Sequence, residues 1–215
     1  MASRMIHLCI GKIISDRIED IRKERFLFGS ILPDSAVDKA NSGSHFAKTI
    51  GEDRKLFDFN EFYERFRDEM FCDEMYLGYY FHLIQDGMFR KFVYYDLGLL
   101  KFRGKEGFLD RLYADYHSIN GYIFEKYSLK AIPSLPSDFE QSKLSGLCSF
   151  DYNSFAADMA NDFNDIYRTD NVYVSADDAD SFIHSAAGKC IAEYNAIRCG
   201  EHAVMPSEFA WDIKK

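Results

Sequence analysis

The segment 74–95 constrains the fold of this chain more than any other segment, because it is apolar on almost every side: EMYLGYYFHLIQDGMFRKFVYY. A helix that is hydrophobic all round belongs inside a protein, surrounded by other elements. His82 and Asp86 are the main exceptions within it. We therefore expect 74–95 to be the central helix of a helical bundle, with a polar pair buried inside it.

Apolar residues at three- and four-residue spacing indicate further helices along the chain. They fall at 5–24, 60–71, 106–127, 153–167 and 177–198. Asp58 or Asn60 is expected to cap the second of these, and Ser175 with Asp178 resembles a capping box for the last. No internal repeat is present, and no alternating run is long enough to predict a sheet. The expected fold is an all-α, single-domain multi-helix bundle over 1–215.

Two stretches break the helical pattern. The segment 26–57 contains Pro33 and several Gly, Ser and Asn residues, which favour an irregular connection, with room for a short helix. A loop of this length in a compact domain is usually functional or disordered. The segment 131–146 is rich in Ser and Pro and is the candidate linker, although it is too slight to predict a domain boundary.

Composition limits the partners and the compartment. A length of 215 residues suits one domain with a substantial core. A net charge of -9 argues against stable binding of duplex DNA, which needs a basic surface. A phosphate substrate remains compatible, because bound divalent cations can supply a local positive field.

Five cysteines without a CxxC spacing indicate neither a disulfide framework nor a thiolate zinc site, so a reducing cytoplasm is expected. The first residues do not resemble a secretion signal, and no stretch has the length of a transmembrane helix. Nothing in the sequence indicates an oligomeric state.

His82 and Asp86 are four residues apart, so in a helix both side chains project from one face. An imidazole nitrogen and a carboxylate oxygen form a ligand set that suits zinc, manganese or iron. The alternative is a buried His–Asp hydrogen bond. An ionised carboxylate in an apolar helix is costly unless its charge is compensated, and a bound cation compensates it well.

Three residues outside this helix are further candidate ligands: His7, Asp34 and His45. Asp34 and His45 lie in the irregular segment, and loops that cross a rigid helix often deliver functional side chains to it. Each has a simpler interpretation: Asp34 as a turn residue after Pro33, and His45 as a solvated loop histidine. His7 is expected at the edge of an apolar stripe, where it could also be a satisfied, partly buried histidine.

Asp115, His117 and Arg90 extend this set. Asp115 falls on the buried face of the helix 106–127, so it needs a partner. Asp115 or His117 is a candidate ligand or catalytic group, and the alternative is a hydrogen bond to a ligand. Arg90, one turn beyond Asp86, is a candidate contact for a substrate phosphate, and the alternative is a solvated arginine.

The order of these motifs resembles the zinc-dependent phospholipase C family, which is related to the zinc-dependent single-strand nucleases. The resemblance covers about the first 125 residues: His7, then GSILPD, then SHF, then GYYFHLIQD. It implies an all-helical domain in which one metal is held by Asp34, His45, His82 and Asp86. It further implies that Asp86 bridges to a neighbouring metal bound by His7.

The chain departs from the family pattern in two respects. The secreted phospholipases use the amine of an N-terminal Trp as a ligand, and no Trp precedes His7 here. The third metal site of the family needs a later histidine and an HxxxE pair, but His117 is followed at this spacing by Gly121. One or two ions are therefore expected, most simply zinc, with Asp115 or His117 completing the second site.

These observations predict a metal-dependent hydrolase of phosphate esters, of the phosphodiester or phospholipid head-group type. Metal-activated water would attack phosphorus, with Asp34 as a ligand that also orients or deprotonates this water. Two alternatives stay open. One is a non-enzymatic helical protein with a structural metal or a His–Asp network, and the other is a nuclease acting on single strands.

Overall fold

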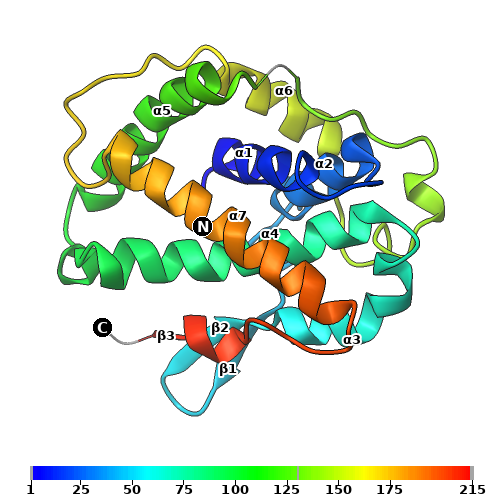
Figure 1. Cartoon of the computed structure of the whole chain (residues 1–215). Helices are drawn as coiled ribbons and strands as arrows, with labels where there is room; N and C mark the ends of the chain where they lie inside the picture. The colour runs from blue at the N-terminus through cyan, green and yellow to red at the C-terminus, as the bar shows by residue number, and fades with distance from the viewer. Residues whose placement is uncertain (1, 130, 214–215) are drawn as a thin grey trace.

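The computed structural model describes residues 2–129 and 131–213, and this part of the chain is mostly helical (Figure 1). Its α-helices are α1 (Arg4–Ser15), α2 (Lys23–Ile31), α3 (Phe59–Met70), α4 (Glu74–Lys91), α5 (Phe108–Tyr127), α6 (Tyr152–Asp162) and α7 (Ala176–Ile197). Short 3-10 turns are η1 (Leu32–Ser35), η3 (Leu99–Phe102), η4 (Phe139–Gln141) and η5 (Pro206–Phe209), and η2 (Phe92–Asp96) is a π-helical turn.

Helix α4 is the centre of the packing, as the sequence predicts. Every residue from Met75 to Phe89 is buried. The helix begins where the side chain of Asp73 accepts a hydrogen bond from the main chain of Met75. It packs against α2, α3 and α7, so the continuous apolar surface read from the sequence is covered on several sides at once.

The prediction of one helix over 5–24 is wrong, because the chain turns after Ser15 and begins α2 at Lys23. Asp20 in this turn has a φ of 61°, a left-handed conformation that interrupts a right-handed helix. Ile18 and Ile21, which extended the apolar stripe, pack partly buried against the core from the turn. The apolar spacing therefore predicted correctly that these residues pack against the core, but it did not predict that the helix ends before them.

A small antiparallel sheet corrects the expectation of a fold without strands. Its strands are β1 (Ala47–Ile50), β2 (Arg54–Phe57) and β3 (Trp211–Asp212), in the order β1-β2-β3. Ala47 pairs with Phe57 in the β1–β2 hairpin. Figure 1 shows the sheet at the bottom of the view, beside the C-terminal segment. The segment 26–57 is thus a helix, a 3-10 turn, a loop and a hairpin rather than one irregular connection.

The predicted helix starts are confirmed at α3, where Asp58 is the cap, and at α7, where Ser175 and Asp178 form the capping box. The segment 131–146 contributes Phe139 and Leu144 to the same hydrophobic cluster that holds α1 and α4. No helix in the described part of the chain has the length and apolarity needed to cross a membrane.

Helices α2 and α4 meet at unusually close range, and this contact positions the candidate site. A Cβ atom on Gly29 would lie 2.0 Å from the carbonyl oxygen of Met75, a distance that no side chain tolerates. The close approach brings the main chain of Ser30 next to His82.

Candidate metal centre

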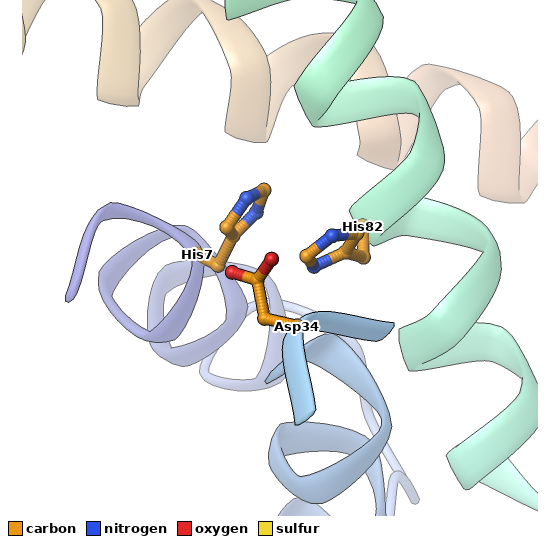
Figure 2. A group of neighbouring side chains, drawn as sticks. All are labelled: His7, Asp34 and His82. Carbon is orange, nitrogen blue, oxygen red and sulfur yellow. The ribbon is translucent and has the colours of Figure 1, made fainter. Parts of the chain in front are cut away.

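Four separate segments deliver five side chains to one buried cluster, which we call the His–Asp cluster. It consists of His7 from α1, Asp34 from η1, His45 from the loop before β1, and His82 and Asp86 from α4. Each of the five is at most 5% exposed. Figure 2 shows the rings of His7 and His82 and the carboxylate of Asp34 facing one another. The convergence predicted from the sequence is therefore present.

Three of these residues place their ligand atoms at the mutual spacing of a tetrahedral metal site, and Asp34 lies at that distance from one of them. The Nε2 atoms of His45 and His82 lie 3.2 Å apart. Oδ2 of Asp86 lies 3.4 Å from Nε2 of His45 and 3.6 Å from Nε2 of His82. Oδ1 of Asp34 lies 3.5 Å from Nε2 of His45. Zinc bonds of about 2.0–2.1 Å put tetrahedral ligand atoms about 3.3 Å apart, so these distances fit one ion.

His7 contacts the other oxygen of Asp86. Its Nε2 is 3.3 Å from Oδ1 of Asp86, whereas His45 and His82 face Oδ2. The His7 ring stacks on His82 with centroids 3.9 Å apart. Oδ1 of Asp86 thus faces His7, whereas Oδ2 faces His45 and His82.

The beginning of the described chain also reaches this cluster. The main-chain nitrogen of Ala2 donates to Oδ1 of Asp86 at 2.9 Å, in a buried contact. No Trp precedes His7, but a main-chain nitrogen nevertheless lies on the His7 side of Asp86.

Each histidine of the cluster is oriented by a contact to its Nδ1 atom. Nδ1 of His7 lies 2.8 Å from Oε1 of Gln85, and Nδ1 of His82 lies 2.9 Å from the carbonyl oxygen of Ser30. Both partners are acceptors, so in the neutral ring Nδ1 carries the proton and Nε2 has a lone pair directed into the cluster. Nδ1 of His45 lies 2.8 Å from the Ser44 hydroxyl, which can accept in the same way. Metal-binding histidines are commonly oriented like this.

Two buried atoms in the cluster have no hydrogen-bond partner among the described residues: Nε2 of His7 and Oδ2 of Asp86. Buried polar atoms are rarely left unpaired, because an unmade hydrogen bond leaves the cost of desolvation uncompensated. Both atoms are of the kind that donates a lone pair to a cation. A bound ion would satisfy them.

The pKa values of the cluster favour the ionised carboxylates. Burial acts to raise the pKa of Asp34, but the contact with His45 and the charges of His82 and Lys39 together outweigh burial and lower the pKa below its ordinary range. Burial likewise opposes ionisation of Asp86, yet its contacts with His7 and His82 hold its pKa well below 3.8. Both carboxylates are therefore charged at neutral pH.

The two stacked histidines shift in opposite directions. Burial lowers the pKa of His82 to about 4, and the positive charge of His7 adds to this effect. For His7, burial acts to lower the pKa, but the contact with Asp86 outweighs it and raises the pKa above 6.5. His82 is thus neutral and ready to bind a cation at neutral pH, whereas His7 must first release a proton.

A cavity of about 280 Å³ opens on this cluster through Asp34, and we call it the cluster pocket. Its lining includes Arg4, Lys39, Tyr116, Asn120 and Asp162. Lys39 donates to Oδ1 of Asp34 at 2.9 Å. The cluster is therefore buried, but one of its carboxylates borders a space large enough for a small ligand.

The structure does not bring Asp115 to the cluster, contrary to the sequence-based expectation. Its carboxylate accepts hydrogen bonds from the main-chain nitrogens of Val172, Tyr173 and Val174. Asp115 is therefore paired, as its burial requires, but with main-chain nitrogens of a loop and not with a metal-ligand candidate.

His117 and Arg90 also lie elsewhere. His117 is exposed and contacts Asp165 at 3.0 Å, in a separate acidic group with Asp162 at the rim of the cluster pocket. The guanidinium of Arg90 lies 4.1 Å from the centroid of the Trp211 ring. Arg90 is thus held against β3, away from the cluster pocket.

Sequence reasoning missed Gln85 and Lys39. Gln85 is fully buried, and its position beside Asp86 in an apolar helix was the available signal. Lys39 gives no such signal, because a charged residue in a polar loop is unremarkable until the fold shows where its ammonium lies.

Searches of protein-family models, of curated proteins and of solved structures gave no match to this chain. The indications of function are therefore the geometry of the site and the motif order in the sequence.

Proposed function

We propose that this protein is a metal-dependent hydrolase of phosphate esters and that the His–Asp cluster binds its metal ions. The observation that carries the proposal is the meeting of ligand atoms from His45, His82 and Asp86 at 3.2–3.6 Å from one another, with Oδ1 of Asp34 3.5 Å from Nε2 of His45. Three chain segments converge there, and the pocket begins at one of the ligands. The resemblance to the zinc-dependent phospholipase C family supports the same ligand set.

The residues divide into two groups around Asp86. Asp34, His45, His82 and one oxygen of Asp86 would hold the first ion, and His7 with the other oxygen would hold a second. Zinc suits these nitrogen and oxygen ligands, and manganese or iron are the alternatives. A cation there would supply Lewis acidity, which lowers the pKa of a water molecule and offsets charge on phosphoryl oxygens.

Asp34 is the proposed catalytic carboxylate. It is ionised, because its pKa is lowered, and it lines both the cluster and the pocket. A carboxylate in this position can accept a hydrogen bond from the attacking water and direct it toward a phosphate in the pocket. Arg90 has no role in this proposal, since it lies against Trp211.

One observation favours a second candidate, a purely structural metal site. A closed site with four protein ligands is typical of structural zinc, and the first group supplies four ligands that are nearly inaccessible to solvent. The enzyme therefore needs the His7 group, where fewer protein ligands leave positions open. The number of bound ions separates the two candidates.

The test combines metal content with activity. Purified protein is stripped with a chelator, reloaded with zinc, and assayed against a panel of phosphomonoesters, phosphodiesters and short-chain phospholipids. Hydrolysis of at least one class is expected, with loss after stripping and in His82→Ala. Glu64→Ala is a control, because Glu64 is exposed on α3.

One bound ion per chain and no hydrolysis would favour the structural candidate. Full activity in the stripped protein would refute both metal-based candidates. Two ions with hydrolysis that depends on them would support the enzyme.

A further inference from the structure

Lys39 occupies a position that connects the His–Asp cluster with the cluster pocket. It lies in the loop between η1 and β1, and its side chain is 39% exposed, whereas the side chain of Asp34 is only 4% exposed. Its ammonium reaches Oδ1 of Asp34 at 2.9 Å. The same oxygen lies 3.5 Å from Nε2 of His45. The Lys39 ammonium and a bound metal ion would therefore compete for the same carboxylate oxygen.

The second cation of the pocket is already neutralised. Arg4 contacts Asp158 at 2.6 Å and Asp162 at 2.5 Å, so two carboxylates surround one guanidinium. Lys39 has a single carboxylate partner within the described residues, and that partner belongs to the His–Asp cluster. When Asp34 binds a metal ion, Lys39 is the pocket cation whose charge is left uncompensated.

We propose that Lys39 is the phosphate-binding residue of the cluster pocket, and that it is held on Asp34 until a metal ion takes over that carboxylate. This inference rests on the proposed function. An ammonium beside a divalent cation is repelled by it, and an anion that contacts both relieves the repulsion. A phosphate group entering the pocket is such an anion.

The chemistry of lysine suits this change of partner. Its ammonium is a compact charge on a flexible four-carbon chain, so it can leave one oxygen and reach another nearby. Its partial exposure leaves the side chain room to move toward the pocket. Metal binding and phosphate binding are then coupled through one residue: Lys39 competes with the first and assists the second.

The coupling predicts two opposite effects of Lys39→Met, a substitution that keeps an unbranched side chain of similar length and removes its charge. Zinc binding to the stripped variant, measured by competition with a chromophoric chelator, should tighten about fivefold because a competing cation is gone. Binding of inorganic phosphate to the zinc-loaded, desalted protein, measured by calorimetry, should weaken about tenfold or more because a charge-assisted hydrogen bond is lost. A loss of packing alone would not tighten zinc binding.

Lys48→Met is the matched control. Lys48 lies on the nearby hairpin and pairs with Asp58 at 3.0 Å, so the variant has the same change of charge outside the pocket. Neither affinity should change in this control. Lys39→Arg keeps a positive charge at the original position and should retain most of the phosphate affinity.

The outcomes are distinguishable from those of the proposed function. If the wild-type protein binds no zinc, the proposed function fails and this inference fails with it. If zinc binds but Lys39→Met changes neither affinity, or changes only one, the role of Lys39 is refuted while the metal site stands. Only the pair of opposite shifts, absent in Lys48→Met, supports the inference.

Discussion

A Cβ atom on Gly78 would come within 2.1 Å of the carbonyl oxygen of Phe26, so α4 and α2 touch backbone to backbone at this point. One turn further along α4, His82 contacts the carbonyl oxygen of Ser30 through Nδ1. The spacing of the two helices therefore sets the orientation of a metal-ligand candidate. The packing of the two helices and the orientation of His82 therefore depend on the same α2–α4 contact.

The variant Gly78→Ala tests this dependence. The added methyl group forces α2 and α4 apart, which should lower the free energy of unfolding by about 2–3 kcal/mol. Zinc affinity should also fall, because Ser30 moves away from His82. Urea unfolding of the stripped protein and a zinc competition assay measure the two effects.

Gly188→Ala is the control, since a Cβ at Gly188 in α7 meets no atom within 4 Å. It should be neutral or stabilise the protein by up to about 1 kcal/mol, because alanine is the better helix former. A Gly78→Ala protein with the stability and zinc affinity of the wild type would contradict the account.

Gln85 is predicted to orient His7 for the second ion. Gln85→Met removes the acceptor for Nδ1 of His7 and leaves the groups around the first ion in place. The weaker of two zinc affinities should fall about 10- to 100-fold, while the tighter one stays constant. Zinc titration of the stripped protein reports both, and the same substitution at the exposed Gln141 serves as control. Equal weakening of both sites would argue for a general loss of structure instead.

Asp115 is predicted to be structural. Asp115→Ala leaves the main-chain nitrogens of Val172, Tyr173 and Val174 without their acceptor, which should cost about 2–4 kcal/mol of unfolding free energy. The number of zinc ions per folded chain should not change. Glu125→Ala, at an exposed position of the same helix, should stay within about 0.5 kcal/mol of the wild type. Loss of one ion in Asp115→Ala would restore this residue as a ligand.

The stability of the stripped protein should be greatest near pH 6.5. His82 has a pKa of about 4 in the folded protein against an ordinary 6.5, so on acidification this imidazole takes up a proton in the unfolded chain at a higher pH than in the folded one. Stability is then lost as the pH falls from 6.5 to 4, by roughly 3 kcal/mol. His7 has a raised pKa, so its contribution is complete below 6.5 and is lost as the pH rises through the raised value.

Urea unfolding across the pH range measures the loss of stability on the acidic side and on the basic side of pH 6.5. His82→Gln should reduce the loss of stability on the acidic side, and His7→Gln should reduce the loss on the basic side. The carboxylates of Asp34 and Asp86 have lowered pKa values and add a further loss of stability only as the pH falls below their ordinary 3.8. A wild-type stability that rises steadily from pH 4 to pH 9 would contradict the opposite shifts of the two histidines.

The candidate site could be predicted from sequence where a residue conflicts with its neighbourhood. His82 and Asp86 are polar residues at helical spacing within an apolar helix, and both are fully buried in the structure. Asp34 and His45 have no such conflict with their polar loop, and only the order of motifs indicated that they join the pair. Asp115 shows the limit of the argument, because a buried acid can be satisfied equally well by main-chain amides.

The fold was predictable where apolar periodicity and capping agree, as at α3 and α7. It was not predictable at the turn between α1 and α2, where Ile18 and Ile21 continue the stripe although the chain has left the helix. The sheet was missed because three of the four residues of β1 are exposed and β3 has only two residues. Such short strands depend on pairing partners that are distant in sequence, above all the β2–β3 pair.

Both proposals require this chain to bind metal through the five residues of the His–Asp cluster. Elemental analysis of the purified protein after zinc reconstitution and desalting tests it directly. Two zinc ions per chain are expected in the wild type, and fewer than one in a folded His82→Ala variant. A wild-type protein that retains no metal at micromolar zinc, although folded by circular dichroism, would contradict it.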